Sequence, residues 1–352
     1  MGAPGSVRSR LRATALVLLL AGLLVGGIIA SAVTGQLAVA PTEVLGSLLR
    51  AIGIDTAWAP TDPIVESTLW VVRFPRIVMG LMVGAALAVA GAVMQAIFGN
   101  PLAEPGVVGV SSGAALGASI AITIGASVLG GPGVAVFAFL GGLVATLLVY
   151  AVARAGGRTE VVTLLLTGIA INAFAQAGIA FVLFIADSAS REQIVFWQLG
   201  SIAGSMWNQV LIVAVVALFG TLAALFLARR LDLLALGERN ARQLGVNVER
   251  LRIIAIVLVA LLTGAAVAFT GIIAFVGLVV PHIIRMIIGP AHRGLILASA
   301  VGGGALLVIA DLMTRTLIAG AELPIGMLTS LVGGPFFFYL LYRQRRRSGG
   351  WA

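Results

Sequence analysis

Long runs of apolar residues, separated by short stretches of Arg, Pro and Gly, extend along the whole chain. A helix that crosses a bilayer needs roughly 20 mostly apolar residues, and most of these runs reach that length. Runs bounded in this way predict ten helices, over 13–33, 76–97, 107–127, 133–153, 161–186, 207–228, 253–272, 275–289, 295–318 and 325–342. We therefore expect an all-α, polytopic membrane protein in which 1–352 forms a single transmembrane domain.

The composition supports this class of protein. Of 352 residues, 60% are hydrophobic and 10% are charged, against roughly 45–50% and 25% in soluble domains. All 22 basic residues are Arg. Because a chain without Lys cannot contain the G-x-x-x-x-G-K-S/T phosphate loop, we expect this one not to hydrolyse ATP by itself. It has no Cys, which excludes disulfides and thiolate metal sites.

The distribution of Arg predicts the orientation of the chain. An even number of crossings puts both termini on one side, and both termini are rich in Arg. Because cytoplasmic loops carry the excess of Lys and Arg, we expect both termini in the cytoplasm. Seventeen of the 22 Arg then lie inside, and five lie outside, namely Arg50, Arg73, Arg76, Arg191 and Arg315. Topology thus explains the net charge of +9, and nucleic acid is not an expected partner.

Two segments lie outside the predicted spans, an extracytoplasmic one over 34–72 and the longest cytoplasmic one over 229–252. Residues 30–32, Ala-Ser-Ala, resemble a signal-peptide cleavage site. The preceding apolar stretch is longer than the 7–15 residues of a usual signal core. We therefore expect an uncleaved first helix.

Six small or Pro residues recur at a displacement of 180, among them Gly84 with Gly264 and Pro101 with Pro281. This recurrence suggests a duplicated half. The first copy begins at the second helix and the second copy at the seventh. Because five helices is an odd displacement, the copies cross the membrane in opposite directions, as in the inverted repeats of transporters. Helices 2–5 are thereby paired with helices 7–10.

Residues 109–113 fit the G-x-S-x-G pattern of a serine nucleophile, with Ser111 at its centre and Ser112 beside it. A nucleophile elbow follows a strand, whereas this pattern begins a membrane helix. Gly109, Gly113 and Gly117 instead share one helix face, which favours close helix packing or pathway lining. An intramembrane serine hydrolase stays open as an alternative.

Polar residues at two further places suggest a pathway. Gly168, Asn172 and Gln176 fall four apart on the fifth helix, so they either line a cavity or pair with another helix. Residues 100–106, which include Asn100, Pro101 and Leu102, read as a gate at the mouth of a pathway or as an ordinary cytoplasmic turn.

Charged residues suggest two contact surfaces. Asp311 and Arg315 are spaced for an ion pair. The external Arg73 and Arg76 suit either an acidic docking partner or lipid headgroups. The segment 229–252 suits two short helices, broken at Gly237 and Gly245, that would expose a charged face to a cytoplasmic protein, with a solvated loop as the alternative.

At these residues the chain resembles the FecCD family, the permease subunits of type II ABC importers for iron-siderophores, haem and cobalamin. The resemblance rests on residues 73–76, 84–113, 234–245, 277–282 and 310–326, which span nearly the whole chain. It implies the ABC type II importer permease fold with ten helices and a place in the bacterial inner membrane. It also implies four kinds of partner: a second permease subunit, identical or a close paralogue, two cytoplasmic ATPases, an extracytoplasmic binding protein and membrane lipid.

The resemblance also implies roles for individual residues. Arg73, Arg76 and Arg315 match arginines that receive acidic residues of the binding protein, and Asn100, Pro101 and Leu102 match a cytoplasmic gate. Gly168, Asn172, Gln176, Ser111 and Ser112 line the translocation pathway. The match to the helices that couple to the ATPase covers Leu234, Ala235, Leu236, Gly237, Glu238, Ala241, Arg242, Leu244 and Gly245. At 160–163 the sequence differs from a second gate of the family.

The expected function is ATP-driven uptake of an iron complex, because residues 168–173 and 196–201 look most like haem importers. Ferric siderophore ranks second and cobalamin third. We expect no catalytic, cofactor or metal site in this chain, with ATP and Mg²⁺ bound by the partner ATPase. An ion-coupled secondary transporter also fits ten helices and an inverted repeat, with Asp311 as the clear candidate for a coupling acid.

Overall fold

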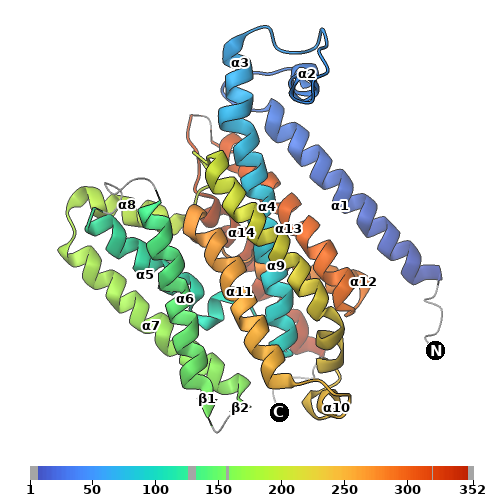
Figure 1. The fold of residues 1–352 in the computed structure, drawn as a ribbon, viewed down its shortest axis with the longest axis vertical. Helices are drawn as coiled ribbons and strands as arrows, with labels where there is room; N and C mark the ends of the chain where they lie inside the picture. Colours follow the sequence, from blue (N-terminus) through green and yellow to red (C-terminus); the bar gives the residue numbers. More distant parts are fainter. Residues whose placement is uncertain (1–6, 126–131, 156–157, 319, 348–352) are drawn as a thin grey trace.

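The computed structural model describes residues 7–125, 132–155, 158–318 and 320–347. All ten predicted helices are present in it (Figure 1). They are α1 (Val7–Val33), α4 (Phe74–Phe98), α5 (Val110–Thr123), α6 (Gly133–Ala153), α7 (Val161–Ile185), α9 (Trp207–Leu234), α11 (Val248–Thr270), α12 (Val276–Ile288), α13 (His292–Thr316) and α14 (Ile325–Arg347). The prediction of an all-α membrane fold is confirmed.

Two of the ten helices are too short to cross a bilayer unaided. Eight described helices are long and apolar enough to span a membrane, while α5 and α12 have 14 and 13 residues. At 1.5 Å per residue they extend only about 20 Å, against roughly 30 Å of hydrocarbon. The predicted range 107–127 was too long for α5, which ends at Thr123, and residues 126 and 127 lie outside the described ones.

Short elements fill the connections between these helices. On the segment predicted to be extracytoplasmic lie α2 (Pro41–Ala51), α3 (Pro63–Ser67) and the π-helix η1 (Thr68–Arg73), which runs directly into α4. The remaining connections hold the 3-10 helix η2 (Pro105–Val108), α8 (Ser188–Leu199), α10 (Glu238–Gln243) and a two-residue hairpin of β1 (Arg154–Ala155) with β2 (Arg158–Thr159). Hydrophobic periodicity over 18 or more residues does not detect elements this short.

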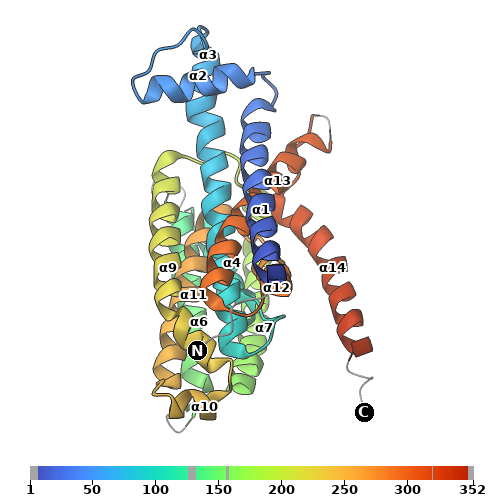
Figure 2. The same ribbon diagram turned by 90° about the vertical axis from the view of Figure 1, so that its right-hand side faces the viewer.

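α10 lies at one end of the bundle and α2 and α3 lie at the other, and α1 ends toward the α2 side while α14 runs away from it (Figures 1 and 2). This is the arrangement that an even number of crossings requires. The five arginines predicted to be external lie on α2, η1, α4, α8 and α13, which are elements that reach the half of the bundle nearer α2 (Figure 1). We call the α2 end the outer end and the opposite one the inner end.

The centre of the fold is α4, which packs against α13, α9, α11 and α12 and is buried along nearly its whole length. Glycines allow these contacts. A Cβ on Gly84 would lie 2.2 Å from the Gly303 carbonyl oxygen of α13, and one on Gly91 would lie 1.7 Å from the Gly277 oxygen of α12. Because helices in lipid associate largely through close packing, small residues at these points determine how near α4 its neighbours lie.

The two halves repeat the same helix order. In α4 to α7 and again in α11 to α14 the lengths run long, short, long, long. In Figure 1, α4 runs from the outer to the inner end and α11 runs back, which agrees with an inverted repeat. However, the predicted displacement of 180 residues between equivalent positions of the two halves is wrong. Pro101 lies in a turn after α4 whereas Pro281 lies inside α12, so the recurring residues are not structural equivalents.

Candidate functional site

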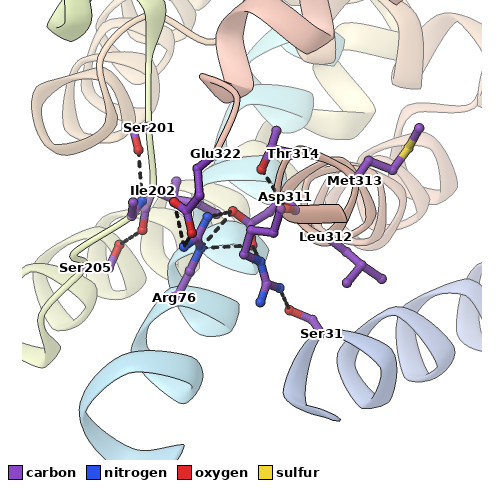
Figure 3. A network of polar contacts seen from close by, with 12 residues as sticks. Ser31, Arg76, Ser201, Ile202, Ser205, Asp311, Leu312, Met313, Thr314 and Glu322 are labelled. Carbon is purple, nitrogen blue, oxygen red and sulfur yellow. Dashed lines mark hydrogen bonds and ion pairs between the residues drawn. The ribbon is translucent and has the colours of Figure 1, made fainter. Parts of the chain in front are cut away.

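Four charged side chains form an ion network at the outer end (Figure 3). Arg76, at the start of α4, donates from Nε to both carboxylate oxygens of Asp311 on α13, at 2.9 and 3.1 Å. Its Nη1 donates to the two carboxylate oxygens of Glu322, at 3.0 and 3.3 Å. Nε of Arg315 lies 3.3 Å from Asp311 Oδ2. The ion pair expected from the spacing of Asp311 and Arg315 is confirmed.

Most of this outer ion network is buried. The side chains of Asp311 and Arg76 are 3% and 10% exposed, whereas that of Glu322 is 49% exposed. Buried charges are tolerated when they are paired and hydrogen-bonded, and removal of one partner is costly. A coupling acid of an ion-driven transporter must release its partner cation in each cycle. Asp311, held between two guanidinium groups, is poorly suited to that role.

The other contacts of these arginines reach the connection between α1 and α2. Arg73, the last residue of η1, donates from both Nη atoms to main-chain carbonyls within residues 32–37. Arg315 donates to the Thr34 carbonyl at 3.0 Å and to the Ser31 hydroxyl at 2.6 Å. The guanidinium groups therefore hold the end of α1 against α4 and α13.

The structure brings together the three arginines that the sequence placed on a docking surface. Arg73, Arg76 and Arg315 line one cavity of about 510 Å³, together with Glu322. Arg73 and Arg76 are only 4% and 8% exposed, so they form the wall of this cavity and do not project from the surface. An acidic side chain of a partner would have to enter the cavity to reach them.

The polar stripe of α7 divides into a packed part and an exposed part. The Ser112 hydroxyl of α5 donates to Asn172 Oδ1 at 2.5 Å, and Asn172 Nδ2 donates to the Gly106 carbonyl at 3.4 Å. A Cβ on Gly168 would lie 1.9 Å from the Val107 carbonyl oxygen. Gln176, one turn further along, is exposed on the surface of the chain. Hydrogen bonding between helices therefore occurs on part of this stripe, while cavity lining by Gln176 stays a prediction.

The glycines around Ser111 serve helix packing, as their spacing predicted. A Cβ on Gly113 or Gly117 would lie within 2.5 Å of main-chain atoms of α6. Ser111 itself is half-buried at the start of α5. The two histidines of the chain lie on α12 and α13.

The proposed gate residues form a tight turn at the inner end of α4. Asn100 Oδ1 accepts a hydrogen bond from the Leu102 backbone N–H at 2.9 Å, and the Pro101 main chain interacts with the His282 ring of α12. Glu104 follows in the same connection. Burial raises the pKa of its carboxyl, because partial removal from water disfavours the charged form.

The segment 229–252 differs from its prediction. It does not hold two short helices, because α9 continues to Leu234 and α10 alone lies between Gly237 and Gly245. Both glycines have positive φ, 97° and 84°, which explains why helix ends fall there. The reason for the longer α9 is that its final turns are packed, with Leu231 fully buried.

Two apolar residues that flank α10 are exposed at the inner end, the end of the bundle that lies away from α2. Leu236 and Leu244, on either side of α10, are 59% and 58% exposed. Within α10, Ala241 is fully buried against the bundle, and the other five residues of the helix are exposed. Glu238 pairs with Arg252 of α11, and it also lies 3.4 Å from Arg242. The helix is therefore anchored on one side and free to bind a partner on the other.

Sequence reasoning missed several polar pairs that link distant helices at the inner end. Gln95 of α4 donates to the Leu278 carbonyl at 3.2 Å and accepts from Arg285 Nη2 at 3.1 Å. The carboxylate of Asp232 lies 2.7 Å from His292 Nδ1. Residues 60 to 190 positions apart carry no local pattern that could reveal such pairs. Glu322 was missed for the same reason, because its partner Arg76 lies 246 residues away.

One cavity joins the gate turn to α10. Its volume is about 420 Å³, and its lining includes Pro101 of the gate turn, Gln95 of α4, and Gly237 and Glu238 at α10. Among the residues that the structure describes, no group of three or more acidic or His side chains could hold a metal ion.

Comparison with known proteins identifies relatives along nearly the whole chain. The FecCD transport family matches residues 17–343. The hemin transport system permease protein HmuU of Yersinia pestis is 41% identical over 306 residues, which cover 85% of this chain and 91% of that protein. The cobalamin import system permease protein BtuC of Halobacterium salinarum is 44% identical over 277 residues, covering 79% of this chain and 74% of that protein.

A solved structure shows the same fold. A chain described as an inward-facing conformation of a metal-chelate type ABC transporter superposes with a TM-score of 0.81 and 33% identity. The match covers 94% of this chain and 99% of that chain. Together with the multi-pass helical architecture, these relatives establish that the chain belongs to the FecCD transport family and is a permease of an ABC importer with the type II fold.

Proposed function

We propose that this permease takes up an iron complex, haem first, across the bacterial inner membrane, with ferric siderophore and then cobalamin as the alternatives. In this proposal the inner end faces the cytoplasm, both termini lie there, and two ATPase subunits bind at α10. A second permease subunit completes the pathway, and a binding protein delivers the substrate at the outer end.

The single observation that carries the proposal is the exposed Gln176 on α7. An amide in contact with lipid hydrocarbon would lose its hydrogen bonds, so polar residues within spans face other helices or water-filled cavities. Asn172, one turn away, lies on the same side of α7 and pairs with Ser112. The exposed end of this stripe, at Gln176, therefore suits a cavity shared with a second permease subunit, through which the substrate passes.

Haem as the substrate is supported by the resemblance of residues 168–173 and 196–201 to haem importers, and by the HmuU relative. The BtuC relatives keep cobalamin as the main competitor. The test is uptake into proteoliposomes that contain the permease with its ATPase and binding protein, given haem, a ferric siderophore or cobalamin. ATP-dependent accumulation of haem alone supports the proposal, and accumulation of cobalamin alone refutes haem.

The coupling role of α10 is tested separately. Leu236→Ser together with Leu244→Ser removes the exposed apolar groups but leaves the buried Ala241 side of α10 intact. We expect binding-protein-stimulated ATP hydrolysis to lose its coupling to uptake. The control is Val152→Ser, which changes an equally exposed apolar residue at the inner end of α6. Uptake and stimulation equal to wild type in the double variant would exclude α10 as the coupling element.

A further inference from the structure

Glu322 differs from every other member of the outer ion network, because about half of its side chain is exposed while its carboxylate is bound to Arg76. We propose that Glu322 occupies the position that an acidic side chain of the extracytoplasmic binding protein takes when it docks, so that docking exchanges one carboxylate for another at Arg76. This inference rests on the proposed function, which supplies the binding protein.

The geometry of Arg76 permits such an exchange. Its Nε and Nη2 atoms hold Asp311, while Nη1 holds Glu322. Release of Glu322 therefore leaves the buried pair between Arg76 and Asp311 intact. Removing Asp311 would instead leave a buried guanidinium without its main counter-charge, which costs several kcal/mol. Only the Glu322 edge of Arg76 can accept a new carboxylate without breaking the buried pair.

The charges of the outer cavity favour an acidic occupant. Three guanidinium groups, of Arg73, Arg76 and Arg315, line the cavity with the carboxylate of Glu322, and the buried carboxylate of Asp311 pairs with Arg76 and Arg315 from outside the lining. When Glu322 leaves, a single carboxylate remains against three cations. Arg73 donates to neutral main-chain carbonyls, and an ionised carboxylate is a stronger acceptor than these. The cavity of about 510 Å³ has room for a side chain.

Glu322 also lies where its release would act on α14. The connection that carries it is held by two main-chain hydrogen bonds, from Leu323 N–H to the Thr314 carbonyl at 3.1 Å and from Ile325 N–H to the Gly200 carbonyl at 3.0 Å. These join the end of α13, residue 200 and the start of α14. Beyond that joint α14 diverges from the bundle (Figure 2). Exchange of the Glu322 carboxylate for one of the binding protein therefore links docking at the outer end to α14, which begins there.

The test is the affinity of the complete permease–ATPase complex, in lipid nanodiscs, for its binding protein. Glu322→Gln keeps the shape of the side chain but removes the charge that competes for Arg76. Since partly exposed ion pairs contribute modestly, we expect binding to tighten about 2- to 5-fold. Asp55→Asn is the control, because it also removes a negative charge at the outer end but from a side chain that is 92% exposed and lies 3.9 Å from Arg50. Its affinity should equal that of wild type.

The outcomes separate the inference from the proposed function. The exchange would be overturned if Glu322→Gln bound the binding protein as tightly as wild type or more weakly. This conclusion requires that Glu322→Gln melts at the wild-type temperature and that Asp55→Asn has wild-type affinity. If Glu322→Gln melts early, Glu322→Ala in the same assay must show the tightening, and weaker binding there would also overturn it. If the wild-type complex does not bind the protein at all, the proposed docking itself fails.

Discussion

Gly91→Ala tests whether the contact between α4 and α12 is as close as the structure shows. A Cβ at this position would lie 1.7 Å from the Gly277 carbonyl oxygen and 2.6 Å from its Cα. Both obstacles are backbone atoms, which cannot rotate away. To restore ordinary van der Waals separation, α12 must move by roughly 1.5–2 Å, which breaks its contacts along α4.

The size of the effect follows from two opposing contributions. Overpacking of a close contact costs up to about 3 kcal/mol, while replacing a helical Gly by Ala contributes about 1 kcal/mol of helix stability. The net expectation is a loss of about 2 kcal/mol. Gly80→Ala, on the same helix, is the matched control. Its Cβ would lie 3.2 and 3.5 Å from side-chain atoms of Ile202 and Val308, and the nearest backbone atom, at 3.9 Å, is at ordinary contact distance, so we expect no loss or a slight gain.

The assay is thermal unfolding of the purified permease, followed by tryptophan fluorescence in the same detergent for wild type and both variants. Because Gly91→Ala and Gly80→Ala share the gain in helix propensity, the difference between them reports the backbone contact alone. We expect Gly91→Ala to melt several degrees below Gly80→Ala. Equal melting temperatures would show that α12 does not lie against α4 at this distance.

Three further predictions concern charge and chemistry. Asp311→Asn removes the shared counter-charge of Arg76 and Arg315, both nearly buried, and should cost about 3–5 kcal/mol of unfolding free energy in denaturation experiments; a loss below about 1 kcal/mol would refute the pairing. Folding raises the pKa of the Glu104 carboxyl. The protonated carboxyl therefore contributes its full stability below the pKa that Glu104 has in the unfolded chain, and this contribution is lost as pH rises through its pKa in the folded chain. The melting temperature of Glu104→Gln should therefore exceed that of wild type increasingly from mildly acidic to mildly alkaline pH, and a constant difference would contradict this. Ser111→Ala should keep full uptake in proteoliposomes, whereas lost uptake with intact folding would revive a catalytic role.

Much of the fold could be predicted from the sequence because its main elements are local. A run of about 20 apolar residues must form its hydrogen bonds within itself in a bilayer, so length and hydropathy alone predict α1, α9 and α11. The prediction fails where neighbours decide. α5 is shorter than predicted and is buried along most of its length, and α9 continues past 228 because Leu231 is buried.

The candidate site was predictable in part. Spacing of four residues on one helix identified the pair of Asp311 and Arg315, since such residues face each other. It could not identify Glu322 or Arg285, because their partners on α4 are 190 or more residues away. The recurrence of small residues and Pro at a displacement of 180 residues also gave a wrong alignment of the two halves, since these residues serve different packing needs in each half.

The sequence by itself determined that the chain crosses a membrane several times and which charges lie toward each end of the bundle, because these follow from hydropathy and from the positions of Arg between the apolar runs. Only the tertiary structure decided which of those charged side chains are buried and which groups they bind. Arg73 and Arg76 stand among the external arginines in the sequence, yet the fold buries both, one against main-chain carbonyls and the other against Asp311. The physical reason is that a buried guanidinium must be satisfied by several acceptors at once, and helices far apart in the sequence supply them only after they have packed.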